Sequence, residues 1–139
     1  MKNSILAGAI AGAIIGIVNF TLGIILAYIG VTEPLGGVWE IWDPSLYILA
    51  ALALLSLSVI WGTFFGAIYA RFLDNIPGKG VMKGLIFGLL IWIVKDVAAG
   101  SYVALIFMEI SISINLIIIG FSMWIVYGLI LGYLYTPSK

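Results

Sequence analysis

Four long apolar runs, separated by short polar segments, constrain the fold of this chain more than any other feature. They cover residues 4–31, 44–73, 82–107 and 116–135. Each run can cross the roughly 30 Å hydrocarbon core of a bilayer as a helix, the form that satisfies its own backbone hydrogen bonds in lipid. The sequence therefore predicts an all-α, polytopic membrane four-helix bundle, with residues 1–139 forming a single transmembrane domain.

The composition agrees with this class and argues against several functions. The chain is 64% hydrophobic and 9% charged, and its formal net charge is zero, so it offers no basic surface to a nucleic acid. It has no cysteine and no histidine, which are the ligands of most zinc, iron–sulfur and haem sites. No catalytic triad, Walker or dinucleotide-binding pattern is found. We therefore expect no enzymatic activity, no metal and no cofactor.

The distribution of charge predicts the orientation in the membrane. One side of the four-span topology carries Lys2, Arg71, Lys79, Lys83 and Lys139, and the other carries Glu33, Glu40, Asp43 and Glu109. Basic residues favour the cytoplasmic side. Both termini are therefore expected in the cytoplasm, with the protein in the plasma membrane of a prokaryote.

The spans repeat in pairs. Four positions of the first span recur in the third at an offset of 76, and three positions of the second recur in the fourth at an offset of 66. These pairs are Gly8 with Gly84, Gly12 with Gly88, Ile15 with Ile91, Asn19 with Lys95, Gly62 with Gly128, Gly66 with Gly132 and Tyr69 with Tyr135. The pattern predicts two tandem, parallel-oriented helical hairpins, residues 1–75 and 76–139. The alternative is a chance alignment of Gly-x-x-x-Gly, which is common in membrane helices.

Glycines at this spacing also predict where helices pack. Small residues on one helical stripe let two backbones approach closely in a membrane. We expect helix packing at Gly8, Gly12, Gly16, Gly62, Gly66, Gly84, Gly88, Gly128 and Gly132.

Lys95 and Asp96 are adjacent near the middle of the third run. A charge at the centre of a membrane helix costs about 2.5 to 3.5 kcal/mol and marks a functional site by default. At 100° per residue, Lys95 falls on the stripe of Gly84 and Gly88, which predicts that it points into the bundle. Neighbouring residues do not face each other on an α-helix, so a direct ion pair between Lys95 and Asp96 is not assured.

Other polar side chains are expected at the same depth. The repeat gives Asn19 the position equivalent to Lys95, on a face turned inward. Together they predict a polar centre for binding or ion relay, formed by Lys95, Asp96, Asn19, Tyr102 and Ser58.

Two functions fit these features. The leading one is a small transporter or channel for a proton, an ion or a small solute, working as a homo-oligomer because four helices leave little room for a pathway. The alternative is a non-catalytic structural or accessory subunit of a larger membrane complex, where the charges form an internal ion pair or an assembly contact. The expected partners are the lipid bilayer and other membrane subunits or copies of the chain, with no nucleic acid.

Overall fold

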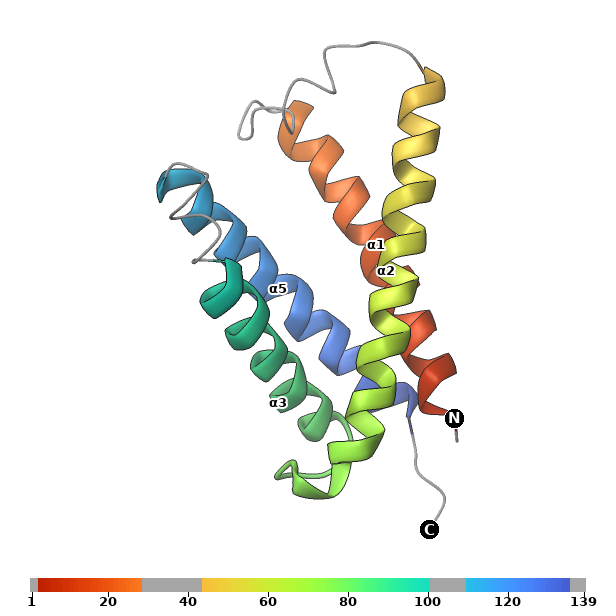
Figure 1. Cartoon of the computed structure of the whole chain (residues 1–139), viewed down its shortest axis with the longest axis vertical. Coiled ribbons are helices and arrows are strands. Elements are labelled where there is room, and N and C mark those ends of the chain that lie inside the picture. The colour runs from red at the N-terminus through yellow and green to blue at the C-terminus, as the bar shows by residue number, and fades with distance from the viewer. Residues whose placement is uncertain (1–2, 29–43, 101–109, 136–139) are drawn as a thin grey trace.

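The computed structural model describes residues 3–28, 44–100 and 110–135, and every element in these ranges is helical (Figure 1). The elements are α1 (Ser4–Tyr28), α2 (Pro44–Phe72), the 3-10 turn η2 (Leu73–Asn75), α3 (Val81–Trp92), the π-helix η3 (Ile93–Gly100) and α5 (Ile110–Leu134). The predicted all-helical class is confirmed. Among the described residues, α1, α2 and α5 contain segments long and apolar enough to cross a membrane.

The first two helices begin where the local chemistry favours a start. The Asn3 side-chain oxygen accepts hydrogen bonds from the backbone N–H groups of Ile5 at 3.0 Å and Leu6 at 3.2 Å, which caps α1. Helix α2 begins at Pro44. Proline is favourable at the first position of a helix, because a backbone N–H there would have no partner within the helix. These starts agree with the predicted spans from residues 4 and 44.

Helix α5 begins earlier than the span predicted within it. The helix starts at Ile110, in the predicted polar link, whereas its membrane-length apolar segment is Ile117–Leu134, close to the predicted span 116–135. The segment from Ile110 to Ile119 contains neither proline nor glycine, so its isolated Ser and Asn residues do not interrupt the helix. The predicted third span, 82–107, corresponds to α3 and η3 as far as Gly100, and the rest lies outside the described residues.

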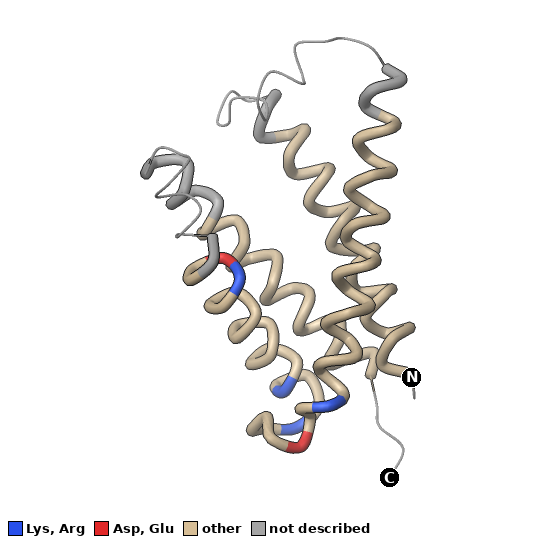
Figure 2. Tube along the Cα trace, viewed as in Figure 1, with Lys and Arg blue, Asp and Glu red and all other residues tan. Residues whose placement is uncertain are grey.

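A tight turn returns the chain from α2 to α3. Gly78 has φ +97° and Gly80 has φ +51°, a conformation that glycine adopts without a steric penalty. The Lys83 ammonium donates to the carbonyl oxygen of Leu73, which ties the first turn of α3 to η2. Figure 2 shows that the charges of the described chain gather at this turn, apart from one further pair higher in the α3–η3 segment.

Helices α1 and α2 touch through their backbones. A Cβ built on Gly8 would lie under 3.0 Å from the carbonyl oxygen of Gly62 and from the Cα of Gly66. A Cβ on Gly62 would in turn meet the carbonyl oxygen of Gly8 and, at 2.7 Å, the Cα of Gly12. No side chain fits between the helices at these positions.

Helices α3 and α5 touch in the same way. A Cβ built on Gly84 would meet the carbonyl oxygen of Gly128 and, at 2.7 Å, the Cα of Gly132. Gly84 stands 76 positions after Gly8, and its two partners stand 66 positions after the two partners of Gly8. The α1–α2 pair and the α3–α5 pair therefore use corresponding residues for their closest contacts.

The two pairs meet at the end of the molecule that holds the α2–α3 turn and diverge toward the other end (Figure 1). The buried core that joins them consists of Ala7, Ala11, Tyr69, Ile76, Phe87, Ile91, Tyr127 and Leu131. Large apolar side chains in the first half of α2, such as Ile48 and Leu52, are exposed. The core thus lies at one end, and the pairs separate above it.

Tyr127 holds the two pairs together through a buried hydrogen bond. Its hydroxyl donates to the carbonyl oxygen of Gly62 at 2.8 Å, at the point where α1 and α2 cross. A net contribution of about 1 kcal/mol is typical of such a bond. Tyr127→Phe should therefore lower the thermal stability in detergent by about this amount, whereas Tyr133→Phe, at a 76% exposed side chain, should not change it. Equal melting of both variants would show that the bond contributes nothing.

Candidate functional site

The helix that carries Lys95 and Asp96 changes its winding just before them. From Ile93 to Gly100 it is a π-helix, which takes about one more residue per turn than an α-helix. The stripe drawn at 100° per residue therefore does not extend past Trp92. The Lys95 side chain is 45% exposed, against the prediction that it points into the bundle, whereas Asp96 is only 14% exposed.

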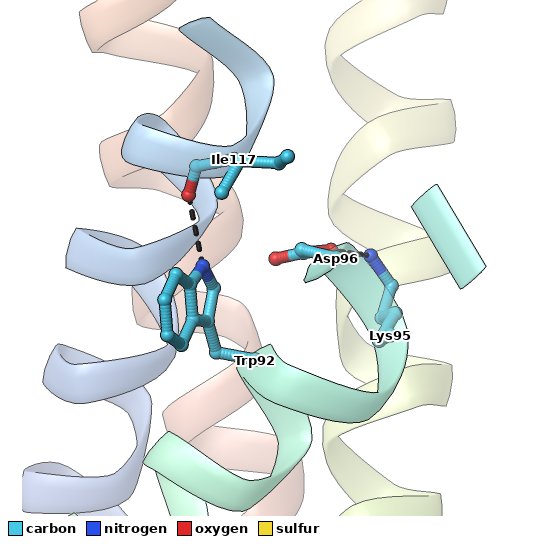
Figure 3. A network of polar contacts seen from close by, with 4 residues as sticks. All are labelled: Trp92, Lys95, Asp96 and Ile117. Atoms are coloured by element: carbon cyan, nitrogen blue, oxygen red, sulfur yellow. Dashed lines mark hydrogen bonds and ion pairs between the residues drawn. The ribbon is translucent and has the colours of Figure 1, made fainter. Parts of the chain in front are cut away.

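Lys95 and Asp96 form a direct ion pair (Figure 3). The Lys95 Nζ donates to Asp96 Oδ1 at 2.9 Å. The sequence alone did not predict whether this ion pair forms, because adjacent side chains diverge on an α-helix. The long, flexible lysine stem allows the ammonium to turn back to the neighbouring carboxylate.

The Asp96 carboxylate lies against Gly120 of α5. A Cβ built on Gly120 would stand 2.8 Å from Asp96 Cγ and closer still to Oδ2. Oδ2 is buried and accepts no hydrogen bond from any residue in the described parts of the chain. A buried acceptor without a donor costs about 1 to 3 kcal/mol, so a hydrogen-bond donor at this oxygen would be stabilising.

Trp92 fixes the start of the π-helix on α5. Its indole N–H donates to the carbonyl oxygen of Ile117 at 2.9 Å (Figure 3), and its ring meets that of Phe121 edge to face at 5.0 Å. This anchor lies one helical turn before Asp96. It therefore holds the backbone that presents the carboxylate to α5.

The Lys95 ammonium also lies over an aromatic ring. Its Nζ is 5.3 Å from the centre of the Trp124 ring, within the range of a cation–π contact. Trp124 meets Phe65 of α2 edge to face at 5.2 Å, and Phe65 stacks on Trp61 at 5.6 Å. We call Trp61, Phe65 and Trp124 the aromatic row. The ammonium thus sits between a carboxylate and the α5 end of the aromatic row.

The other predicted members of the polar centre lie elsewhere. Asn19 is exposed on α1, and no hydrogen bond joins it to Lys95 or Asp96 among the residues that the structure describes. At Gly23, one turn after Asn19, an added Cβ would meet nothing within 4 Å, so this face of α1 no longer packs against another helix. This separation explains the exposure of Asn19. Ser58 packs at the α1–α2 crossing, 2.9 Å from a Cβ built on Gly16. Tyr102 lies outside the described residues.

Sequence reasoning missed the parts that α5 contributes to the site. Gly120 and Trp124 are not among the predicted site residues, although both contact the charge pair. Gly120 lies about 80° and 120° around the helix from Gly128 and Gly132, so the glycine stripe does not mark it. Trp124 lies about 40° from Gly128, close to that stripe, which is a weak signal for its position at the α3–α5 contact.

Gly120→Ala should destabilise the protein through Asp96. The added methyl group would overlap the carboxylate, which must rotate away and weaken the ion pair, at a cost of about 1 to 2 kcal/mol. In an Asp96→Ala background the same change should be close to neutral, and thermal melting of the four proteins measures this coupling. An equal loss in both backgrounds would mean that the methyl group clashes with something other than Asp96.

Comparisons with known proteins assign no function to this site. No protein-family model matches the chain, and neither the curated proteins nor the solved structures include a match.

Proposed function

We propose that the chain is an integral membrane protein of four spanning helices, built from two hairpins inserted the same way up. Three membrane-length apolar helices and the corresponding glycine contacts of the two pairs support this topology. The basic residues at the α2–α3 turn support a cytoplasmic location for that turn and for both termini. The proposed location is the plasma membrane of a prokaryote.

The orientation can be tested directly because the chain has no cysteine. A single cysteine in place of Lys79, at the α2–α3 turn, should be protected from an impermeant thiol reagent in intact cells. The same cysteine should react once the membrane is permeabilised. Labelling in intact cells would reverse the orientation.

We further propose that the protein is a small transporter or channel for a proton, an ion or a small solute. The observation that carries this function is the state of Asp96: its Oδ1 is paired with Lys95, and its buried Oδ2 has no donor among the described residues. Buried polar groups in proteins are almost always satisfied. A transported species that brings a proton or an N–H group would satisfy this oxygen while it is bound.

The setting of the pair supports the same function. Lys95 and Asp96 lie in an apolar helix, where ionisable residues mark ion and substrate pathways. They also lie in a π-helical segment, and interruptions of this kind are frequent at functional sites. Four helices are too few to enclose a transport pathway, so the transporter is proposed to work as a homo-oligomer.

One observation favours the alternative of an accessory subunit. The Lys95 side chain is 45% exposed, and a charge is costly where it faces lipid. Another membrane subunit could cover this ammonium with a polar group. In that case the pair is an assembly contact, and the purified chain alone transports nothing.

Flux through the purified protein in liposomes tests the transport function. Wild-type protein should carry protons or small cations down an imposed gradient, as followed with an enclosed pH-sensitive dye and with radiolabelled ions. Asp96→Asn should reduce this flux at least tenfold, whereas Asp74→Asn, the same change at the α2–α3 turn, should not affect it. Absence of flux in the wild type, together with a stoichiometric partner on purification from native membranes, would favour the accessory subunit.

A further inference from the structure

We propose that Asp96 and the face of Trp124 form a binding site for an organic ammonium ion, and that Lys95 occupies this site as an internal competitor. This proposal rests on the proposed transport function, because it names the class of substrate that the transporter would carry. It concerns binding, however, so it can be tested without measuring transport.

The Lys95 ammonium shows what the site recognises. Its nitrogen lies 2.9 Å from Asp96 Oδ1 and 5.3 Å from the centre of the Trp124 ring. A carboxylate supplies a charge-assisted hydrogen bond, and an indole face attracts a cation through its quadrupole. Both contacts depend on an ammonium group and not on the rest of the lysine, so a ligand with the same group can make them.

Lys95 is placed so that it can be exchanged. Its side chain is 45% exposed, and its four-carbon stem is flexible, so the ammonium can leave Asp96 and move toward a polar region while the backbone stays fixed. When a second ammonium takes its place, Asp96 keeps a cationic partner. The exchange therefore avoids leaving a buried carboxylate unpaired, which is the costly outcome when one charge of a pair is removed.

The geometry also indicates which ammonium ions fit best. Lys95 satisfies only Oδ1, and Oδ2 has no donor in the described part of the chain. A primary ammonium can form the hydrogen bond to Oδ1 that Lys95 forms, whereas a quaternary ion has no N–H group, so primary amines should bind better than quaternary ions of similar size. Beside the ammonium position, the aromatic row extends from Trp124 through Phe65 to Trp61 and offers an apolar surface. The proposed class is therefore a primary amine with an aromatic or alkyl group.

Calorimetric titration in detergent with phenethylammonium tests the proposal, with 2-phenylethanol as the uncharged ligand of the same shape. Lys95→Met should bind phenethylammonium about tenfold or more tightly than the wild type, because the competitor is removed. Lys79→Met, a control at the α2–α3 turn, should bind like the wild type. Asp96→Asn should abolish saturable binding, and Trp124→Leu should weaken it about three- to tenfold, as expected for loss of a cation–π contact. The alcohol should show no saturable binding to any variant.

Several results would overturn the site. Binding by Asp96→Asn equal to that of the wild type would exclude the carboxylate, and unchanged affinity in folded Lys95→Met would exclude competition by Lys95. If Lys95→Met does not fold, Lys95→Gln gives the same test, because it keeps a hydrogen-bond donor without the charge. Flux that depends on Asp96 without any binding of the amine would refute this site and leave transport standing. Amine binding without flux of any species would refute transport and leave the site standing.

Discussion

Replacing Gly84 by alanine should strongly destabilise the protein, whereas the same change at Gly23 should leave its stability unchanged or raise it. A Cβ on Gly84 would meet backbone atoms of Gly128 and Gly132, which cannot rotate away as a side chain can. Overpacking typically costs about 1 to 3 kcal/mol, and a backbone contact should place this variant at the upper end. At Gly23 nothing lies within 4 Å of the added atom, so only the gain in helix propensity of up to about 1 kcal/mol remains.

The corresponding contacts of the two pairs extend this prediction. Gly8→Ala should be destabilising to a similar extent, because its Cβ would meet Gly62 and Gly66 as that of Gly84 meets their counterparts. Thermal melting of the three variants in one detergent compares them under equal conditions. If Gly84→Ala and Gly23→Ala melt at the same temperature, α3 and α5 do not pack through their backbones.

Lys95→Leu should be more harmful to folding than Asp96→Val. Removal of Lys95 leaves a carboxylate that is only 14% exposed without its partner, and breaking a buried pair costs about 3 kcal/mol. Removal of Asp96 leaves an ammonium in an apolar segment, but its flexible stem can move it toward a polar region and it keeps its contact with the Trp124 ring, so a smaller loss of about 2 kcal/mol is expected. Melting temperatures in detergent give the order of the two variants.

The double variant, Lys95→Leu with Asp96→Val, should be as stable as the wild type or more stable. Apolar residues of similar volume often replace a buried ion pair without loss, since the pair recovers little beyond its desolvation cost. A double variant that loses as much stability as the two single variants together would contradict this expectation. It would mean that the two side chains act independently and that their ion pair contributes little to the fold.

The helical class and the beginnings of the first two helices could be predicted from local chemistry alone. The apolar runs set the length of the helices, and Asn3 and Pro44 are residues that favour helix starts. The start of α5 at Ile110 was harder to predict, because Ser and Asn are tolerated inside an apolar helix when no proline or glycine accompanies them. Polar residues alone are therefore a weak signal for where a helix begins, although the apolar segment Ile117–Leu134 begins close to the predicted position.

The geometry of the charge pair could not be predicted from periodicity. A 100° stripe assumes α-helical winding, but η3 is a π-helix that begins directly after Trp92, the residue bonded to Ile117 of α5. The change in winding accompanies a contact between two helices, which a single-helix pattern does not contain. The exposure of Asn19 likewise depends on where α1 separates from its neighbours, and a repeat in the sequence does not specify that point.

Flux through the double variant in liposomes tests the central claim most directly, because this variant should fold without the charge pair. If Lys95 and Asp96 bind or relay a transported species, the reconstituted double variant should melt like the wild type in detergent and carry at least tenfold less flux. Gly23→Ala, which changes a residue away from the pair, should transport at the wild-type rate. Wild-type flux through a folded double variant would contradict the account and remove Lys95 and Asp96 from the transport mechanism.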